Sequence, residues 1–167
     1  MLTGVRPDKP VTWALADGKT PDEARRLLEE DYFVTPERAA LAVETGAHAL
    51  NAGRGLGPRD IAVYVGIPFC PTRCAYCRFV SASVEKSFSL MEPYLAALAE
   101  EITAAGRMVK EAGLRIKSFY MGGGTPTTLS ASQMDALLTA VNRNFDLSDC
   151  VEYCIEAGRP DTIDREK

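Results

Sequence analysis

Apolar positions from residue 61 onward follow two patterns, one typical of strands and the other typical of helices. Short apolar runs at 61–65, 116–121 and 149–156 predict strands, and the uniformly apolar first run predicts a buried one. Between them, apolar residues three and four positions apart predict helices over 91–113 and 130–145. The order β-α-β-α-β predicts an α/β fold with a three-stranded parallel sheet. The predicted apolar stripes of the helices are Leu95, Leu98, Ile102, Ala105 and Val109, then Met134, Leu137, Leu138, Val141 and Phe145.

The first sixty residues show two helix starts and no strand pattern. Thr20-Pro-Asp-Glu23 is a capping box with proline at the first helical position, and it predicts a helix through about Tyr32. Thr35-Pro36-Glu37 repeats the start signal and predicts a second helix toward Leu50. The apolar positions of this second helix are Ala40, Leu41, Val43, Ala47 and Leu50.

A glycine-rich break at 51–58 separates these helices from the first strand. We therefore expect a helical accessory region over 1–58 and an α/β region over 59–167. A parallel sheet of only three strands leaves an edge and a face uncovered. For this reason we expect the second region to be the first part of a longer domain, and the chain alone to aggregate or bind ligand poorly.

Composition and charge argue against several classes of protein. The 167 residues are 46% hydrophobic and 25% charged, which is typical of a globular protein with a sizeable core. The net charge of -4, without a basic cluster, argues against a nucleic-acid partner. No apolar run approaches the ~20 residues that span a bilayer, so no membrane partner is expected. Unpaired cysteines without a secretory leader indicate a cytoplasmic setting.

Three cysteines follow the first predicted strand in one loop. Pro68 and Pro71 end that strand, and Cys70, Cys74 and Cys77 follow with three and then two residues between them. This spacing lets one short loop surround a single metal centre. Three thiolates on a [4Fe-4S] cluster would leave one iron open to another ligand.

Simpler interpretations of the cysteines remain open on this motif alone. A structural zinc site needs four ligands, yet the only histidine, His48, lies in a predicted helix. Cys150 and Cys154 lie on the last predicted strand, where Cys154 is expected to face the interior as a small apolar side chain. Five cysteines cannot all pair in disulfides. Structural zinc and free thiols are therefore the alternatives to a cluster.

The spacing of the cysteines, with the aromatic Tyr76 before the last one, resembles the cluster loop of radical S-adenosylmethionine (radical SAM) enzymes. Tyr64-x-Gly-Ile-Pro-Phe-Cys, Gly122-Gly-Gly-Thr-Pro126 and Glu156-Ala-Gly-Arg-Pro160 extend the likeness over most of the chain. Together the motifs resemble the oxygen-independent coproporphyrinogen III oxidase family, in its coproporphyrinogen dehydrogenase-like branch. The resemblance implies a partial TIM-type barrel of parallel strands, with 59–167 as the truncated amino-terminal part of the radical SAM core.

The resemblance also implies two cofactors. Cys70, Cys74 and Cys77 would hold a [4Fe-4S] cluster whose open iron binds S-adenosylmethionine (SAM). Glycines let a backbone pass close to a ligand, and a carboxylate accepts hydrogen bonds from a ribose or an ammonium group. The simpler interpretations are core packing for the tyrosines, a plain turn for the glycines and a solvated glutamate. The residues that match SAM-contacting positions of the family are Tyr64, Tyr76, Gly123, Gly124, Thr125 and Glu156.

The implied activity is the oxygen-independent oxidative decarboxylation of coproporphyrinogen III to protoporphyrinogen IX in haem biosynthesis, by a radical SAM oxidoreductase. Its partners would be a tetrapyrrole substrate and an unidentified electron donor protein. Decarboxylating relatives carry a further cysteine two residues after the third, where this chain has Phe79. Haem-chaperone-like relatives share a phenylalanine there, so a chaperone without decarboxylase activity is the alternative. The roles of Arg159 and of the flanking Arg73 and Arg78 stay open.

Overall fold

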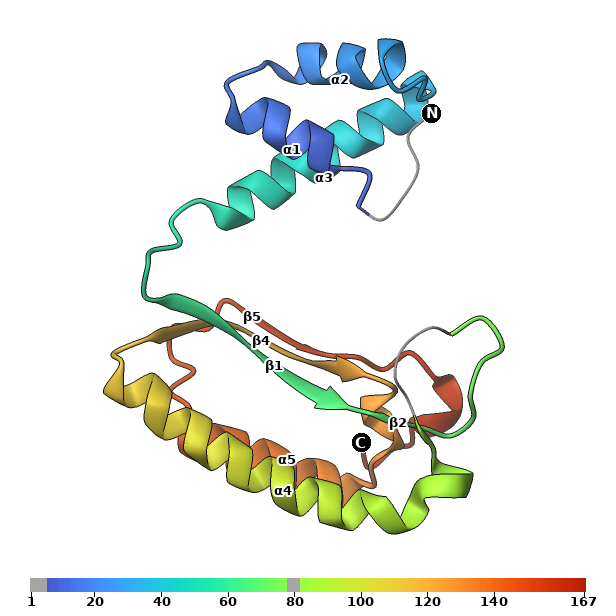
Figure 1. Cartoon of the computed structure of the whole chain (residues 1–167), viewed down its shortest axis with the longest axis vertical. Helices are drawn as coiled ribbons and strands as arrows, with labels where there is room; N and C mark the ends of the chain where they lie inside the picture. Colours follow the sequence, from blue (N-terminus) through green and yellow to red (C-terminus); the bar gives the residue numbers. More distant parts are fainter. Residues whose placement is uncertain (1–5, 78–81) are drawn as a thin grey trace. The chain divides into compact units, whose positions relative to one another are not determined.

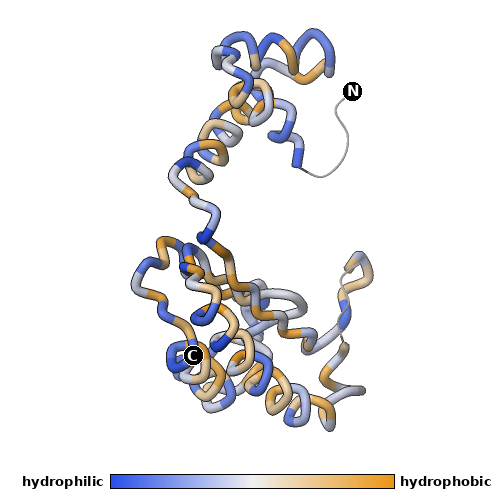
Figure 2. Tube along the Cα trace, turned by 60° about the vertical axis from the view of Figure 1, so that its left-hand side comes forward, coloured by the Kyte–Doolittle hydropathy of each residue, from blue (hydrophilic) through white to orange (hydrophobic). Residues whose placement is uncertain are grey.

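The computed structural model describes residues 6–77 and 82–167. These fall into two compact units, Met1–Gly57 and Pro58–Lys167, coloured blue to teal and green to red in Figure 1. Helices in both units alternate between hydrophobic and hydrophilic residues along the chain (Figure 2), as expected of amphipathic helices. No helix in the described part of the chain is long and apolar enough to cross a membrane.

The described part of the first unit, residues 6–57, contains three helices, one more than the sequence pattern predicts. The predicted capping box is confirmed, because Glu23 N donates to Thr20 Oγ1 at 3.2 Å and Thr20 N donates to the Glu23 carboxylate at 2.7 Å. The three helices pack around a small core, which contains Val11, Ala14, Ala24, Leu28 and Ala39. The helices are α1 (Lys9–Ala16), α2 (Pro21–Glu30) and α3 (Pro36–Gly53).

The buried face of α3 differs from the predicted one. Ala40 and Leu41 are exposed, while Ala39 and Gly46 are buried. A Cβ added at Gly46 would lie 2.8 Å from Val11 Cγ1, so α1 and α3 approach each other at this glycine. The predicted face was therefore partly wrong: Val43 does pack partly buried against the core, but the closest contact with α1 is made by a small residue that the apolar pattern did not include. The helix also continues to Gly53, into the predicted glycine-rich break.

The second unit contains the predicted parallel sheet, in the order β1-β4-β5. Tyr64 pairs in register with Tyr120, and Tyr120 with Cys154, so these three side chains share one face of the sheet. The first two strands are longer than predicted and the third is shorter. A separate pair of two-residue parallel strands carries the first cysteine. The sheet strands are β1 (Asp60–Ile67), β4 (Arg115–Gly123) and β5 (Glu152–Ile155), and the short pair is β2 (Phe69–Cys70) and β3 (Ala82–Ser83).

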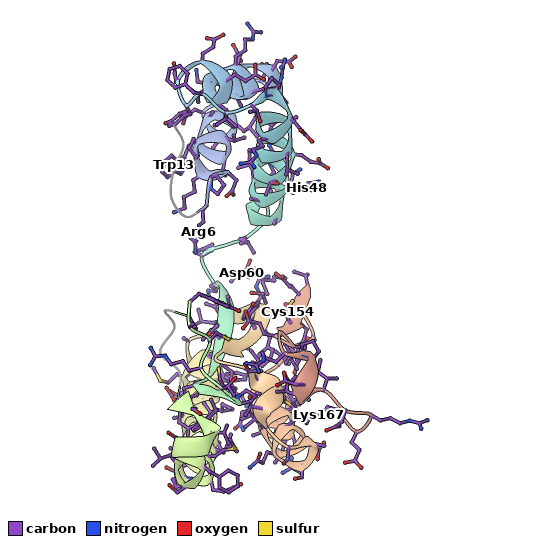
Figure 3. The ribbon with its side chains drawn as sticks, turned by 90° about the vertical axis from the view of Figure 1, so that its right-hand side faces the viewer. Arg6, Trp13, His48, Asp60, Cys154 and Lys167 are labelled. Carbon is purple, nitrogen blue, oxygen red and sulfur yellow. The ribbon has the colours of Figure 1, made fainter. Side chains whose placement is uncertain are left out.

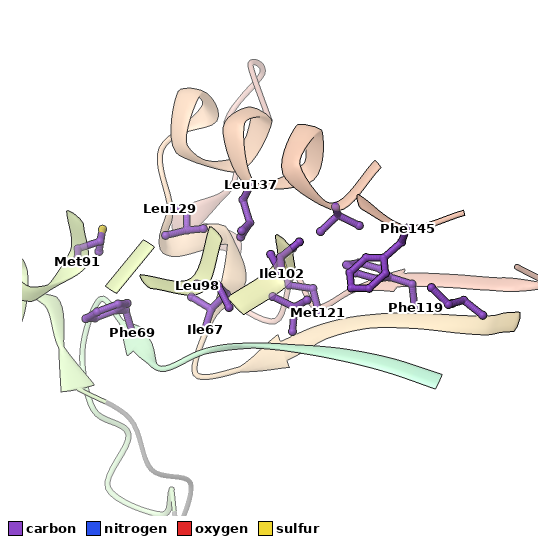
Figure 4. Packing of buried hydrophobic residues seen from close by; sticks show 13 residues of the cluster. Ile67, Phe69, Met91, Leu98, Ile102, Phe119, Met121, Leu129, Leu137 and Phe145 are labelled. Carbon is purple, nitrogen blue, oxygen red and sulfur yellow. The ribbon is translucent and has the colours of Figure 1, made fainter. Parts of the chain in front are cut away.

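Two helices, α4 (Val84–Glu111) and α5 (Ala131–Asn144), cover the same face of this sheet (Figure 1). The predicted stripes are confirmed: they are buried or partly buried against a core that includes Phe119 and Met121 from β4. Figure 4 shows Leu98, Ile102 and Leu137 of the helices facing Ile67, Phe119 and Met121 of the strands. Helix α4 begins seven residues earlier than predicted and has a kink at Ser87. Gly113, just after its end, has a φ of +62°, which is typical of a glycine that terminates a helix.

The other face of the sheet is open in this chain, which corrects two predictions. Ala62 and Tyr64 of β1 are exposed, so this strand is buried on one side only. Cys154, labelled in Figure 3, shares the face of Tyr64 and is half-buried rather than interior. The uniformly apolar run of β1 predicts cover on both faces, and Cys154 was expected to lie under such cover, whereas α4 and α5 both lie on the opposite face. At the amino end of β1, the buried Asp60 carboxylate forms a 2.8 Å ion pair with Arg115.

Candidate cluster and cofactor site

The cysteine loop and the glycine loop meet at the carboxyl ends of β1 and β4. Gly124 N donates a hydrogen bond to Ile67 O at 2.7 Å, and Thr125 N donates to Phe69 O at 2.8 Å. Thr125 is buried, and its hydroxyl donates to Cys70 Sγ at 3.4 Å. The glycine loop therefore binds the backbone leading to the first cysteine and contacts its sulfur.

The two glycines before Thr125 have a steric reason to lack side chains. Gly123 has a φ of +114°, a conformation that other residues rarely adopt. A Cβ at Gly124 would lie 2.6 Å from Phe69 O and 3.0 Å from Cys70 Sγ. These glycines thus allow close contact with the cysteine strand, an explanation that the sequence pattern did not supply.

Glu156 directly follows β5 and reaches the same edge of the sheet. Its amide donates to Met121 O at 2.9 Å, and its carboxylate accepts a 2.5 Å hydrogen bond from Tyr120. This hydrogen bond to Glu156 raises the pKa of Tyr120 to about 12. The Tyr120 ring also stacks on Tyr64, with centroids 5.9 Å apart and planes 11° apart. Glu156 and Tyr64, two predicted cofactor contacts, are therefore joined through Tyr120.

Tyr120 is a site residue that the sequence reasoning missed. It precedes Gly122 by two positions, so the alternation of a strand places it on the same face. A Cβ at Gly122 would lie 2.7 Å from the Tyr120 ring and 3.0 Å from Glu156 Oε2. The alternation of side chains along the strand therefore indicates, from the sequence alone, that Tyr120 lies on the same face as Gly122.

The three predicted cluster ligands lie in one segment but differ in environment. Cys70 is buried on β2, whereas Cys74 and Cys77 are half-buried in the loop that follows, where Cys77 N donates to Cys74 O at 3.1 Å. Tyr76 is exposed, and its hydrogen bond with Cys74 raises the pKa of its phenol. All five cysteines are free thiols, which is consistent with metal ligation. Within the described residues, no three ligand side chains gather closely enough to hold a metal ion.

Arg159 connects the segment after β5 to the cysteine loop. Its guanidinium donates to Thr72 Oγ1 at 3.3 Å and approaches Cys74 Sγ at 3.9 Å. It also forms a bidentate pair with Asp161, at 3.0 and 2.9 Å. Arg73 of the loop is exposed. The predictions for Arg78 and Phe79 fall outside the described residues.

The residues fit a [4Fe-4S] cluster in the chemistry of their donors. Three free thiols lie within eight residues, which is a cluster-ligand set and falls short of the four ligands of a structural zinc site. The bare backbone of Gly124 faces the first of these sulfurs. The ligands and the SAM contacts themselves stay predictions.

Comparison with known proteins gives relatives whose names refer to coproporphyrinogen oxidases, a heme chaperone and anaerobilin synthase. The chain matches no protein-family model. It is 36% identical over 170 residues to the oxygen-independent coproporphyrinogen-III oxidase-like protein HemZ of Bacillus subtilis, covering 100% of this chain and 34% of that protein. It is 30% identical over 151 residues to anaerobilin synthase of Escherichia coli O157:H7, covering 90% and 33%. The heme chaperone HemW of Lactococcus lactis is 35% identical over 62% of this chain and 25% of its own.

One solved structure is similar as well. It is that of coproporphyrinogen III oxidase (HemN) from Escherichia coli, described as a radical SAM enzyme, with a TM-score of 0.50 and 31% identity. The match covers 59% of this chain and 22% of that one. The chain spans about a third of the length of HemZ and of anaerobilin synthase. From these relatives, and from the three motifs in their expected order, the chain belongs to the oxygen-independent coproporphyrinogen III oxidase family of radical SAM proteins.

Proposed function

We propose that this chain binds a [4Fe-4S] cluster and SAM, and that it is part of an oxidoreductase that converts coproporphyrinogen III to protoporphyrinogen IX without oxygen. The observation that carries the proposal is the contact of Thr125 with Cys70, which joins the cysteine motif to the glycine motif. Relatives named oxygen-independent coproporphyrinogen III oxidase, 34% identical in Pseudomonas aeruginosa and 33% in Escherichia coli, support the substrate.

In this proposal Cys70, Cys74 and Cys77 ligate the cluster. When bound, the cluster supplies the electron that cleaves a carbon–sulfur bond of SAM, and the protein supplies ligation and orientation. The glycine loop keeps Cys70 in place through Thr125. This arrangement ties the position of the first sulfur to the loop that is expected to contact SAM.

The remaining SAM contacts would come from Gly123, Gly124 and Thr125 in the loop, and from Glu156, Tyr64 and Tyr76. The hydroxyl of Tyr120 occupies one oxygen of the Glu156 carboxylate, which leaves the other oxygen able to accept a hydrogen bond from a ribose or an ammonium group. The ring of Tyr64 is 60% exposed on the open face of the sheet, where it offers a flat apolar surface. Tyr76 is 86% exposed beside the cysteines and is free to contact a ligand there.

The substrate would be a tetrapyrrole whose propionate side chains become vinyl groups. Each conversion removes one hydrogen atom, one molecule of carbon dioxide and one electron from an ionised propionate side chain. The hydrogen atom would pass to the fragment cleaved from SAM, and the electron would pass to an acceptor of unidentified kind. The electron donor to the cluster would be a separate protein of unidentified kind. These steps belong to the whole protein, because this chain spans only about a third of the length of its relative HemZ.

A second candidate is a haem-chaperone-like radical SAM protein without decarboxylase activity. Relatives named heme chaperone HemW, 33–35% identical in Buchnera aphidicola, Lactococcus lactis and Bacillus subtilis, favour it. The phenylalanine at position 79 favours it too. The full-length protein separates the two: porphyrin product from coproporphyrinogen III supports the oxidase, and haem transfer without product supports the chaperone.

The cluster is tested by anaerobic reconstitution with iron and sulfide. The full-length wild-type protein should develop charge-transfer absorption and release 5′-deoxyadenosine from SAM once reduced. Cys70→Ala, Cys74→Ala and Cys77→Ala should each lower iron content and abolish release, whereas the control Cys150→Ala should do neither. Tight zinc binding without charge-transfer absorption, or cysteine variants that keep wild-type iron content, would overturn the proposal.

A further inference from the structure

The guanidinium of Arg159 contacts two segments that lie far apart in the sequence. On one side it pairs with Asp161 through Nε and Nη2, at 3.0 and 2.9 Å. On the other side Nη1 and Nη2 each lie 3.3 Å from Thr72 Oγ1, and Nη1 lies 3.9 Å from Cys74 Sγ. The residues it joins are 85 and 87 positions away along the sequence.

The backbone that carries Arg159 is itself fixed. Thr162, in the short 3-10 helix Pro160–Thr162, is buried and donates its hydroxyl to Arg159 O at 2.7 Å. The same hydroxyl lies 2.6 Å from Thr127 Oγ1, just after the glycine loop. Only 26% of the Arg159 side chain is exposed. A long side chain with both its ends anchored differs from a solvated surface arginine, since most of its rotamer freedom is already lost.

We propose that Arg159 is a positioning residue, which clamps the cysteine loop through Thr72 and donates an N–H to the Cys74 sulfur. The second role rests on the proposed function, because it concerns the sulfur as a ligand of the cluster. Hydrogen bonds to cluster sulfurs and nearby positive charge stabilise the reduced, more negative state. Arg159 therefore raises the reduction potential of the cluster, and the negative charge of Asp161 limits this increase.

The clamp is tested without any cofactor by amide hydrogen exchange across residues 71–77. The Cys77 amide, which donates to Cys74 O, reports whether the loop is closed. Arg159→Gln should raise its exchange roughly tenfold, the scale of losing a charge-assisted hydrogen bond. Arg159→Lys keeps the charge but loses the planar fork, so it should give only partial protection. The control Arg165→Gln removes an equal charge from an exposed position in the same segment and should leave exchange unchanged.

The electrostatic role is tested by the midpoint potential of the reconstituted full-length protein. Arg159→Gln should lower the one-electron equilibrium constant for reduction by roughly tenfold, which is about 59 mV. Asp161→Asn removes the opposing charge and should shift the potential upward, while Arg165→Gln should shift it little. A merely structural disturbance would shift the midpoint potentials of Arg159→Gln and Asp161→Asn in the same direction. Opposite shifts in these two variants therefore indicate an electrostatic effect.

The outcomes separate this inference from the proposed function. If wild-type protein takes up no cluster, the proposed function fails, while the exchange rates still decide the clamp. If the cluster forms and Arg159→Gln changes neither exchange nor potential, the inference is wrong. It is also wrong if that variant only weakens binding of an anionic substrate, because Arg159 would then be a ligand contact. Midpoint potentials that shift in the same direction in Arg159→Gln and Asp161→Asn would contradict the electrostatic role.

Discussion

A methyl group at position 124 is the smallest change that tests the junction of the two motifs. In Gly124→Ala the added Cβ would lie 2.6 Å from Phe69 O and 3.0 Å from both Ile67 O and Cys70 Sγ. Two of these atoms are the carbonyl oxygens that accept the amide hydrogen bonds of Gly124 and Thr125. The methyl group therefore cannot be accommodated without moving the backbone that presents the first cysteine.

The size of the effect follows from this geometry. Overpacking a tight contact destabilises a protein by about 1–3 kcal/mol, and weakening either backbone hydrogen bond adds about 1 kcal/mol. Gly124 does not have a positive φ, so alanine recovers about 0.4–1 kcal/mol by restricting the unfolded chain. The net loss is about 2 kcal/mol, which lowers the melting temperature by roughly 4–8 °C for a chain of this size.

The assay must follow the right unit, because the two compact units need not unfold together. Trp13 is the only tryptophan and lies in α1, so its fluorescence reports on the helical unit. All tyrosines except Tyr32 lie in the second unit, so the near-ultraviolet circular dichroism of tyrosine reports mainly on that unit. Gly124→Ala should shift the tyrosine transition and leave the Trp13 transition in place.

The matched control is Gly158→Ala, in the third motif. Nothing lies within 4 Å of a Cβ at that position, so its stability and iron content should equal those of the wild type. Gly124→Ala should also bind less iron on reconstitution, since Cys70 is displaced. Wild-type stability together with wild-type iron content in Gly124→Ala would refute the steric argument.

Three further predictions concern packing and ionisation in the second unit. Gly106→Ala would place a Cβ 2.5 Å from Asn144 O, where α4 meets α5, and should lower the tyrosine-monitored melting temperature without changing iron uptake per folded protein. Phe119→Ala removes a fully buried ring and should cost about 3–5 kcal/mol in urea unfolding; a loss below about 1 kcal/mol would contradict its place in the core. The hydrogen bond to Glu156 raises the pKa of Tyr120 from 10 to about 12, so its stabilising effect should be complete below about pH 10 and lost as the pH rises through about 12. Ultraviolet titration should show a late phenolate that disappears in Tyr120→Phe; equal curves for both proteins would contradict it.

The elements whose sequence pattern is local were predictable. The capping box predicted at Thr20 marks the start of α2, because it is complete within four residues. A second capping box, at Ser130, marks the start of α5, which was predicted from the apolar period alone. The short helix α1 was missed, since it buries only Val11 and Ala14 and so leaves little periodicity to detect. An uncovered face was expected of a sheet with only three strands, but which face it would be was not predicted, because the uniformly apolar run of β1 contains no information about which face the helices occupy.

The motifs of the site were predictable, but the contacts between them were not. Tyr120 and Arg159 act across 36 and 85 or more positions, and such pairings depend on strand register and on the path of the chain after β5. The glycine loop shows why this matters for function. Gly123 and Gly124 need to lack side chains to contact the cysteine strand, whether or not SAM binds. A glycine motif alone is therefore weak support for SAM binding, whereas its contact with Cys70 is stronger support. It follows that substitutions in this loop should alter stability and iron content together, and any change in SAM affinity should accompany them.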